Sequence, residues 1–218
     1  MLKERIPETD HGITGEEITQ HYDMMLKHLR DEKVLGDKEI LKHGIKTGKA
    51  LEIGPGPGYL GLEWLKQTQN THVCGAEISE DMIKLANKNA EEYQLSDRTE
   101  YINCDAQKLP FPDETFDAVF TMRSLHEWKQ PIQVFNEIER VLKKDGQYYL
   151  GDLRRDMNSL TLKFLKLAQP DKKLDNGLMS SINASYTIKE ITELVEKSNL
   201  NIYKINKKFL TLEIVGKK

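Results

Sequence analysis

The sequence predicts an α/β protein in which a mainly parallel sheet is covered by helices on both faces. Short apolar segments with the composition of buried strands alternate with amphipathic segments of helical period along the 218 residues. A glycine-rich loop, "GPGPG" at residues 54–58, joins the first of these strands to a helix. Because ligands of such sheets bind beyond the carboxyl ends of the strands, this loop is predicted to form the floor of a ligand site.

The N-terminal region is predicted to be helical. Thr14 and Glu17 have the spacing of a capping box, and the residues that follow place an apolar stripe on one helical face. The residues of that stripe are Ile18, Tyr22, Met25, Leu26 and Leu29. A shorter helix is predicted over residues 37–44. We therefore expect residues 1–47 to form a helical cap and residues 48–218 to form the α/β domain.

The sheet region contains predicted strands that are separated by predicted helices. The strands are expected at residues 49–54, 72–78, 99–104, 116–122 and 147–153. The helix after the first strand is predicted to begin near Gly58, and the next helix is predicted to begin after a Ser79 cap. The last helix of this series has Pro131 in its first turn and is expected to end at Gly146.

The C-terminal region adds one helix and two strands to this prediction. Thr187 and Glu190 form a second capping-box pattern at the start of an apolar helical face. Residues 201–205 and 209–215 then alternate apolar and polar side chains around two lysines, as the strands of a hairpin do.

The composition limits the classes of partner. The 32 basic and 35 acidic residues give a net charge of −3, so no overall field favours nucleic acid. No apolar run approaches the roughly 20 residues that span a membrane, and the N-terminus lacks the apolar core of a signal peptide. Cys74 and Cys104 lie in apolar segments and form no Cys/His cluster. We therefore expect buried free thiols, no metal site, no nucleic-acid or membrane partner, and a cytoplasmic protein.

Two cofactors are compatible with the glycine-rich loop. Gly56 and Gly61 belong to a G-x-G-x-x-G pattern, and Glu77 follows about 20 residues on, as in the NAD fingerprint. Glu52, however, precedes the loop by two residues, and a carboxylate there is unfavourable to a pyrophosphate. It would attract the sulfonium and ammonium groups of S-adenosylmethionine. Asp105, at the end of the third predicted strand, could accept a hydrogen bond from an adenine amino group, which the NAD fingerprint does not require.

Four motifs in order resemble those of the class I S-adenosylmethionine-dependent methyltransferases, in their small-molecule branch. They are "LEIGPGPGYLG" (51–61), "GAEIS" (75–79), "NCDAQKLPFPDETFDAVFTMRSLHEW" (103–128) and "ERVLKKDGQYYLGDL" (139–153). The resemblance implies a Rossmann-like seven-stranded sheet of order 3-2-1-4-5-7-6 with strand 7 antiparallel. It also implies S-adenosylmethionine as cofactor and transfer of its methyl group to a small-molecule acceptor by in-line displacement.

The same resemblance implies a set of cofactor-binding residues. The matching positions are Glu52, Gly54, Gly56, Gly58, Glu77, Ile78, Asp105, Ala106 and Arg123. The first four would surround the methionine portion of the cofactor. Glu77 would hold the ribose hydroxyls, Ile78 would pack on the adenine, and Asp105 with Ala106 would meet the adenine edge. Arg123 occupies the position that commonly supplies a backbone contact near the cofactor.

Four further residues are candidates for the acceptor side. His126 follows the fourth predicted strand and is either a general base or a structural hydrogen-bonding residue. Tyr22 is either a core residue or, as the resemblance suggests, part of a helix that closes the site. Arg154 and Arg155 could bind an anionic acceptor or be solvated charges. In this fold an insertion such as residues 153–186 would form the lid that selects the acceptor.

Two other functions remain open at this level. The first alternative is a noncatalytic S-adenosylmethionine-binding regulator or partner protein, and the second is an NAD-dependent oxidoreductase. We expect a monomer or a homodimer in either case.

Overall fold

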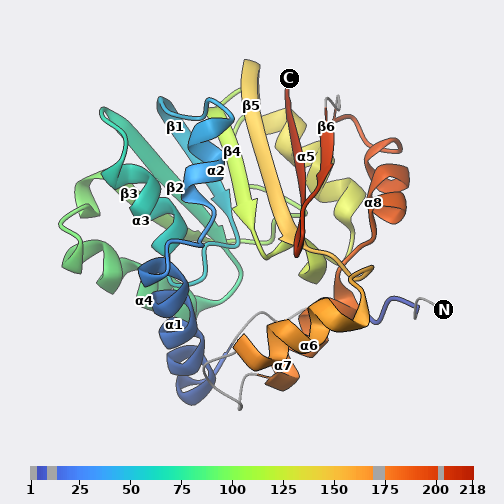
Figure 1. The fold of residues 1–218 in the computed structure, drawn as a ribbon. Coiled ribbons are helices and arrows are strands. Elements are labelled where there is room, and N and C mark those ends of the chain that lie inside the picture. The colour runs from blue at the N-terminus through green and yellow to red at the C-terminus, as the bar shows by residue number, and fades with distance from the viewer. Residues whose placement is uncertain (1–3, 9–13, 169–174, 201–203) are drawn as a thin grey trace.

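A seven-stranded sheet runs through the centre of the protein (Figure 1). The computed structural model describes residues 4–8, 14–168, 175–200 and 204–218. The strands in this part of the chain are β1 (Gly48–Ile53), β2 (Thr71–Glu77), β3 (Thr99–Asn103), β4 (Phe116–Met122), β5 (Leu142–Leu153), β6 (Lys204–Lys207) and β7 (Thr211–Lys217). Their order is β3-β2-β1-β4-β5-β7-β6, and only β7 runs antiparallel to its neighbours. This confirms the predicted Rossmann-like sheet.

Helices cover both faces of the sheet. Those in the described residues are α1 (Glu16–Asp31), α2 (Asp37–Lys42), α3 (Tyr59–Lys66), α4 (Glu80–Glu92), α5 (Pro131–Val141), α6 (Ser159–Ala168), α7 (Asp175–Ala184) and α8 (Ile188–Val195). The short 3₁₀ turns η1 (Ser96–Arg98) and η2 (Leu125–Glu127) precede β3 and α5. None of the helices described has the length and apolar composition needed to span a lipid bilayer.

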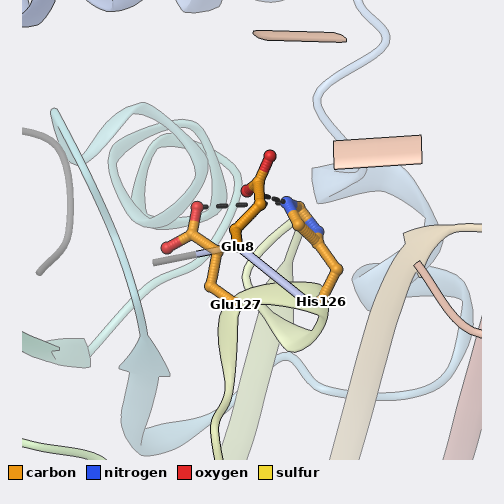
Figure 2. A group of neighbouring side chains, drawn as sticks. All are labelled: Glu8, His126 and Glu127. Atoms are coloured by element: carbon orange, nitrogen blue, oxygen red, sulfur yellow. Dashed lines mark ion pairs between the residues drawn. The ribbon is translucent and has the colours of Figure 1, made fainter. Parts of the chain in front are cut away.

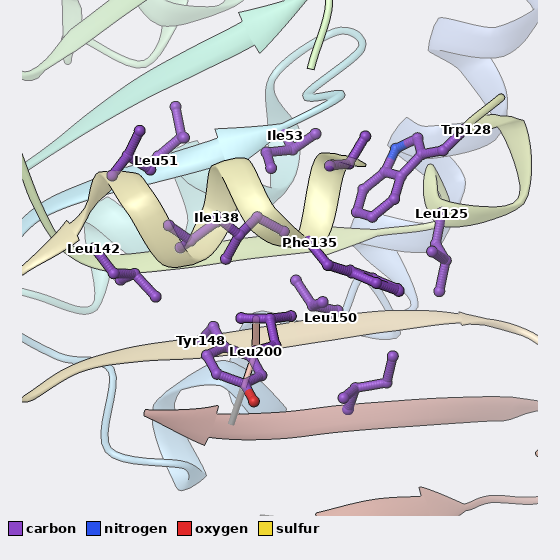
Figure 3. Packing of buried hydrophobic residues seen from close by; sticks show 14 of the residues in the cluster. Leu51, Ile53, Leu125, Trp128, Phe135, Ile138, Leu142, Tyr148, Leu150 and Leu200 are labelled. Carbon is purple, nitrogen blue, oxygen red and sulfur yellow. The ribbon is translucent and has the colours of Figure 1, made fainter. Parts of the chain in front are cut away.

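The two faces of the sheet form two separate cores. Successive side chains of a strand point to opposite faces, so adjacent residues of β1 enter different cores. Leu51 and Ile53 pack in the core with α5 and α8, whereas Ala50 packs in the core with α2 and α3. Figure 3 shows Phe135 and Ile138 of α5 lying against the first of these faces. Burial on both faces explains why the central strands are continuous apolar segments in the sequence.

Two of the predicted helix boundaries are confirmed by their caps. The Ser79 hydroxyl accepts a hydrogen bond from the Met82 amide at 3.3 Å and begins α4. At α8, the Thr187 hydroxyl accepts from the Glu190 amide, and the Glu190 carboxylate accepts from the Thr187 amide. Each bond satisfies a backbone amide that has no acceptor within its own helix.

Two other predicted boundaries are wrong. Helix α1 is preceded by Gly15 at φ 90°, with no side-chain cap, so Thr14 does not form the expected capping box. Helix α5 ends at Val141 rather than at Gly146, because the chain passes directly into β5, which pairs with β4 from Leu142 onward. Of the predicted hairpin strand 201–205, the first three residues lie outside the described part of the chain.

Several elements lie beyond the carboxyl ends of β1, β2 and β4. Helix α1 lies there on one side and α6 with α7 on the other (Figure 1). The predicted lid contains α6 and α7, and a small apolar cluster of its own includes Leu153, Met157 and Ile182. The N-terminal segment, residues 4–8, is joined to α7 by a hydrogen bond from the Ile6 amide to the Asn183 carbonyl at 3.1 Å. The edge of the sheet where ligands are expected is therefore flanked by these elements.

Candidate functional site

A cavity opens at the carboxyl edge of the sheet, where the sequence predicts a ligand site. Its walls come from the ends of β1, β2, β3 and β4 and from α1. The lining residues are Tyr22, Ile53, Gly54, Gly56, Ala76, Glu77, Ile78, Met82, Cys104, Asp105, Ala106, Gln107, Arg123, Ser124, Glu127, Trp128, Lys129 and Val134. The predicted residues Glu52, Gly58, His126, Arg154 and Arg155 are not among the described residues that line it.

The glycines of the first loop have different structural roles. Gly54 and Gly56 have φ angles of 64° and 53°, which favour glycine, and both face the cavity. A Cβ on Gly54 would lie 2.6 Å from the Ser124 Cβ, so only glycine fits there. Gly58 has φ 83° and precedes α3, where a Cβ would lie 2.6 Å from the Tyr101 hydroxyl. Gly58 therefore allows the helix to begin, and Gly54 and Gly56 keep the cavity floor free of side chains.

Glu77 connects the glycine loop to the end of β2. One carboxylate oxygen accepts from the Gly56 amide and the other from the Ser79 amide, each at 2.9 Å. Burial raises the pKa of Glu77, and the hydrogen bonds from these backbone amides oppose the shift. Glu77 also lines the cavity. Its carboxylate is thus held in place by the glycine loop and by the start of α4.

The ends of β2 and β3 form one side of the cavity. Ile78 lines the cavity and exposes 44% of its surface, although large apolar side chains are usually buried. Asp105 is also exposed, and its carboxylate accepts from the Gln107 amide and from the Gln107 side chain, both at 2.8 Å. Ala106 lies beside them in the wall. An apolar surface is therefore next to a fixed carboxylate that can accept further hydrogen bonds.

Glu52 lies beneath the glycine loop, outside the main cavity. Its side chain is buried and one of its oxygens, Oε2, has no hydrogen-bond partner in the described part of the chain. That oxygen would lie 2.4 Å from a Cβ at Gly61, which explains why the first turn of α3 contains a glycine. Burial raises the pKa of Glu52 to about 8, opposed by a hydrogen bond from the Gly61 amide. Glu52 and Gly54 both line a second, smaller cavity adjoining the loop.

Tyr22 and Arg123 line both cavities. The Tyr22 ring lies against the loop, 3.3 Å from where a Cβ on Gly56 would be. Burial raises the pKa of the Tyr22 hydroxyl, so the side chain is neutral near pH 7. The Arg123 guanidinium donates to the Val34 carbonyl at 3.1 Å and to the Leu35 carbonyl at 3.4 Å. These two side chains place α1 and the α1–α2 connection against the cavities at the glycine loop.

His126 lies in η2 beside the cavity, among acidic side chains. Its Nδ1 lies 2.9 Å from one oxygen of Asp152, and its backbone amide donates to the other oxygen at 2.7 Å. Its Nε2 lies 3.5 Å from Glu8 and 3.9 Å from Glu127. Burial alone would lower the pKa of His126, but the charge of Asp152 and its hydrogen bond raise the pKa to about 10. The imidazole is therefore protonated near neutral pH.

Arg154 and Arg155 are buried in contacts that hold the chain after β5. The Arg154 guanidinium donates to Asp156 at 2.6 Å and to the carbonyls of Lys208 and Phe209. The Arg155 guanidinium donates to the Ser185 carbonyl and pairs with Glu190. Both residues are buried and their guanidinium groups are used in contacts within the protein, so we do not assign them to the acceptor.

Three acidic residues near the site were missed by the sequence reasoning. Glu127 directly follows His126 and lines the cavity, so its position after a strand could have indicated it. Asp152, at the end of β5, fits the same rule and is 1% exposed. Glu8 comes from the N-terminal segment, and no local pattern predicts its contact with a residue more than one hundred positions away.

Comparisons with known proteins identify a methyltransferase domain in this chain. A family model for a methyltransferase domain matches residues 51–150. A demethylmenaquinone methyltransferase of Lactobacillus johnsonii is 31% identical over 163 residues, which cover 73% of this chain and 67% of that protein. A sterol 24-C-methyltransferase of Gibberella zeae is 37% identical over 119 residues, which cover 53% of this chain and 31% of that protein. The chain spans between 31% and 50% of the length of three curated relatives, of which the sterol 24-C-methyltransferase is one.

Solved structures share the fold. The structure of a methyltransferase dependent on S-adenosylmethionine from Aquifex aeolicus has a TM-score of 0.66 at 19% identity, and the match covers 82% of this chain and 87% of that chain. A structure from Methanococcus maripaludis has a TM-score of 0.74 at 22% identity, with 95% of this chain and 97% of that chain covered. At these identities the likeness establishes a common fold.

Proposed function

This chain belongs to the class I S-adenosylmethionine-dependent methyltransferases, and from that premise we propose that it transfers a methyl group from this cofactor to a small-molecule acceptor. One observation carries the proposal. Gly54, Gly56, Glu77 and Asp105 all line one cavity, although they lie at the ends of three different strands. Family membership also decides between the two cofactors that the glycine loop allowed, in favour of S-adenosylmethionine.

The residues of the cavity fit this cofactor. Side chains at Gly54 and Gly56 would press against Ser124 and Tyr22, which both line the cavity. The unpaired Glu52 oxygen, buried beside Gly54, offers an acceptor to a cationic group such as the cofactor's ammonium. The exposed Ile78 side chain offers an apolar surface to a flat ring such as adenine. These features support binding of a ligand that carries positive charge at one end and a base at the other.

We assign the cofactor contacts as follows. Glu77 holds the two ribose hydroxyls, Ile78 packs against the adenine ring, and Asp105 accepts from its amino group beside Ala106. Each Glu77 oxygen accepts a hydrogen bond from a backbone amide and still has a lone pair that can accept from a ribose hydroxyl. Arg123 adds a positive charge near the carboxylate end of the methionine portion.

The acceptor is assigned to the part of the cavity that follows β4. Its wall there contains Glu127, Trp128 and Lys129, and Tyr22 of α1 completes it. S-adenosylmethionine supplies a methyl group that its sulfonium charge has already activated. The chain's own contribution is to align the acceptor atom with that methyl group and to exclude water, which can account for a large part of the rate.

The contacts of His126 support a positioning role rather than that of a general base. A histidine with a pKa of about 10 already carries its proton near pH 7 and does not accept another. Both of its ring nitrogens face carboxylates, and its ring is not part of the cavity wall. We infer that His126 joins η2 to β5 and thereby fixes the position of Glu127 and Trp128.

Transfer of a labelled methyl group tests the proposed function. The protein is incubated with S-adenosylmethionine that carries a labelled methyl group and with a pool of small metabolites. We expect label in the small-molecule fraction together with release of S-adenosylhomocysteine. Gly56→Val should abolish the transfer, because its side chain would project from the cavity floor. Gly15→Val is the matched control, since Gly15 also has a positive φ but has no atom within 4 Å of its Cβ position.

Cofactor binding without any transfer to this pool would contradict catalysis and favour the noncatalytic binding protein. Binding of NAD in place of S-adenosylmethionine would contradict the cofactor assignment as well.

A further inference from the structure

One imidazole nitrogen and two carboxylates meet beside the cavity. Figure 2 shows Glu8 and Glu127 pointing toward the Nε2 side of the His126 ring, Glu8 from the N-terminal segment and the other two from η2. The potential ligand atoms of all three residues lie within 4.8 Å of one another. We propose that Glu8, His126 and Glu127 bind a divalent first-row transition-metal ion such as Zn²⁺ or Mn²⁺.

The distances suit a metal ion better than direct hydrogen bonds. The separations of 3.5 Å and 3.9 Å between Nε2 and the two carboxylates exceed ordinary N–H···O distances of about 2.7–3.2 Å. An ion bound at about 2.0–2.2 Å from each ligand holds two ligand atoms at most about 4.4 Å apart. Both measured separations are therefore short enough for one ion to bridge them. The separation between Glu8 and Glu127 is within 4.8 Å and needs only a small rotation of a partly exposed carboxylate.

Asp152 has the position of a second-shell partner. Metal-binding histidines nearly always donate their other ring nitrogen to a carboxylate, a carbonyl or water, which fixes the ring and its tautomer. Nδ1 of His126 lies 2.9 Å from Asp152, and the backbone amide of His126 donates to the same carboxylate. A proton on Nδ1 leaves the lone pair of Nε2 directed toward the two glutamates. The imidazole is thus oriented from behind while its ligand atom faces the cluster.

The charge of the cluster favours a cation. Three carboxylates surround the His126 imidazole. They come from separate parts of the chain and belong to Glu8, Glu127 and Asp152. A divalent ion among these groups would offset their negative charge and supply directed bonds to both glutamates.

The ligand types indicate which metals bind. Imidazole nitrogen together with carboxylate oxygen suits zinc, iron and related ions, whereas Mg²⁺ and Ca²⁺ prefer all-oxygen sites. Three protein ligands leave at least one coordination position for another molecule. Glu127 belongs to the wall of the main cavity, so a molecule in that cavity could reach the ion.

The position of the cluster assigns the ion to the acceptor. Glu127 follows β4, whereas the predicted adenosine contacts follow β2 and β3 on the other side of β1. An ion there would bind an oxygen, nitrogen or sulfur atom of the acceptor and favour loss of its proton, which makes the atom a better nucleophile. This role rests on the proposed function, but binding of the ion does not.

Metal titration of the whole chain tests the site directly. Protein treated with a chelator is titrated calorimetrically with Zn²⁺, Mn²⁺ and Mg²⁺, and we expect one Zn²⁺ or Mn²⁺ per chain with much weaker binding of Mg²⁺. His126→Gln should weaken Zn²⁺ binding at least tenfold, because loss of a direct ligand exceeds the roughly 10–100-fold effect of losing a second-shell partner. Glu8→Gln should act in the same direction, and it changes a segment outside the sheet cores if His126→Gln fails to fold.

The control and a second readout make the result specific. His28→Gln removes an exposed histidine from α1 and should leave the affinity unchanged. Anomalous scattering from crystals grown with Zn²⁺ should give a peak about 2.0–2.2 Å from the His126 Nε2. No stoichiometric binding by the wild type, or equal affinity in the wild type, His126→Gln and Glu8→Gln, would overturn the metal site. Bound metal without methyl transfer would overturn only the proposed function.

Discussion

Replacing Glu77 with glutamine is expected to weaken binding of S-adenosylmethionine at least tenfold. In the wild type, each carboxylate oxygen of Glu77 accepts a hydrogen bond from a backbone amide at 2.9 Å, and Glu77 lines the cavity. Glutamine exchanges one of these acceptors for an NH₂ group, so one ribose hydroxyl loses its partner. A hydrogen bond to a charged group is worth about 1.5–3 kcal/mol, and about 1.4 kcal/mol corresponds to a factor of ten in affinity.

The same substitution is expected to lower the free energy of unfolding by about 1–3 kcal/mol. Either the Gly56 amide or the Ser79 amide loses its acceptor, and an unsatisfied buried donor has a cost of this size. Calorimetric titration and denaturant unfolding measure the two effects separately. Glu80→Gln is the matched control, because Glu80 is an exposed glutamate in the first turn of α4 and should change neither quantity substantially. Unchanged affinity in a folded Glu77→Gln protein would contradict the ribose assignment.

Replacing Asp152 with asparagine is expected to lower the free energy of unfolding by about 3–5 kcal/mol at pH 7 in metal-free protein. Asp152 and His126 are both buried, with side chains 2% and 3% exposed, and they form an ion pair at 2.9 Å. Removing one partner of a buried pair has a cost of this size, and here it leaves the His126 charge with two more distant carboxylates, at 3.5 Å and 3.9 Å. Asp113→Asn is the matched control: the Asp113–Arg140 pair is also 2.9 Å apart, but Asp113 is 73% exposed. That substitution should cost at most about 1 kcal/mol.

The effect of Asp152→Asn should depend on pH in a defined direction. The carboxylates of Asp152, Glu8 and Glu127 face the His126 ring, and Arg5 donates to its carbonyl. Because the folded pKa of about 10 is above the ordinary value of 6.5, the folded protein holds a proton that the unfolded chain releases. The resulting stability is fully present below about pH 6.5 and is lost as the pH rises through 10. The difference in the free energy of unfolding between the wild type and Asp152→Asn should therefore become smaller from pH 7 to pH 10. A difference that grows over this range would contradict the charged pair.

The sheet and the cofactor side of the cavity were predictable because parallel strands place their carboxyl ends together. Gly54, Glu77 and Asp105 each follow a recognisable apolar strand, so their sequence positions alone predicted that they would meet. Ile78 was predictable for the same reason. For these residues, a position at the end of a strand in the sequence is enough to place them at the carboxyl edge of the sheet.

The remaining parts of the site depend on side-chain direction and on contacts between distant segments. Glu52 was expected beside the cofactor, but its strand position did not reveal that its side chain lies beneath the glycine loop near Gly61, at the smaller cavity rather than the main one. His126 was recognised, whereas the acidic partners that fix its charge come from β5 and from the N-terminal segment. At Thr14 the capping pattern was overridden, since α1 begins after Gly15, whose amide donates to Asp81 of α4 at 3.2 Å.

A crystal structure of the complex with S-adenosylhomocysteine tests the central assignment most directly. We expect the adenine to lie between Ile78 and the Asp105–Ala106 loop, with both ribose hydroxyls within hydrogen-bond distance of the Glu77 carboxylate and the methionine portion over Gly54 and Gly56. Adenine in any other part of the molecule, or ribose hydroxyls that do not contact Glu77, would contradict it.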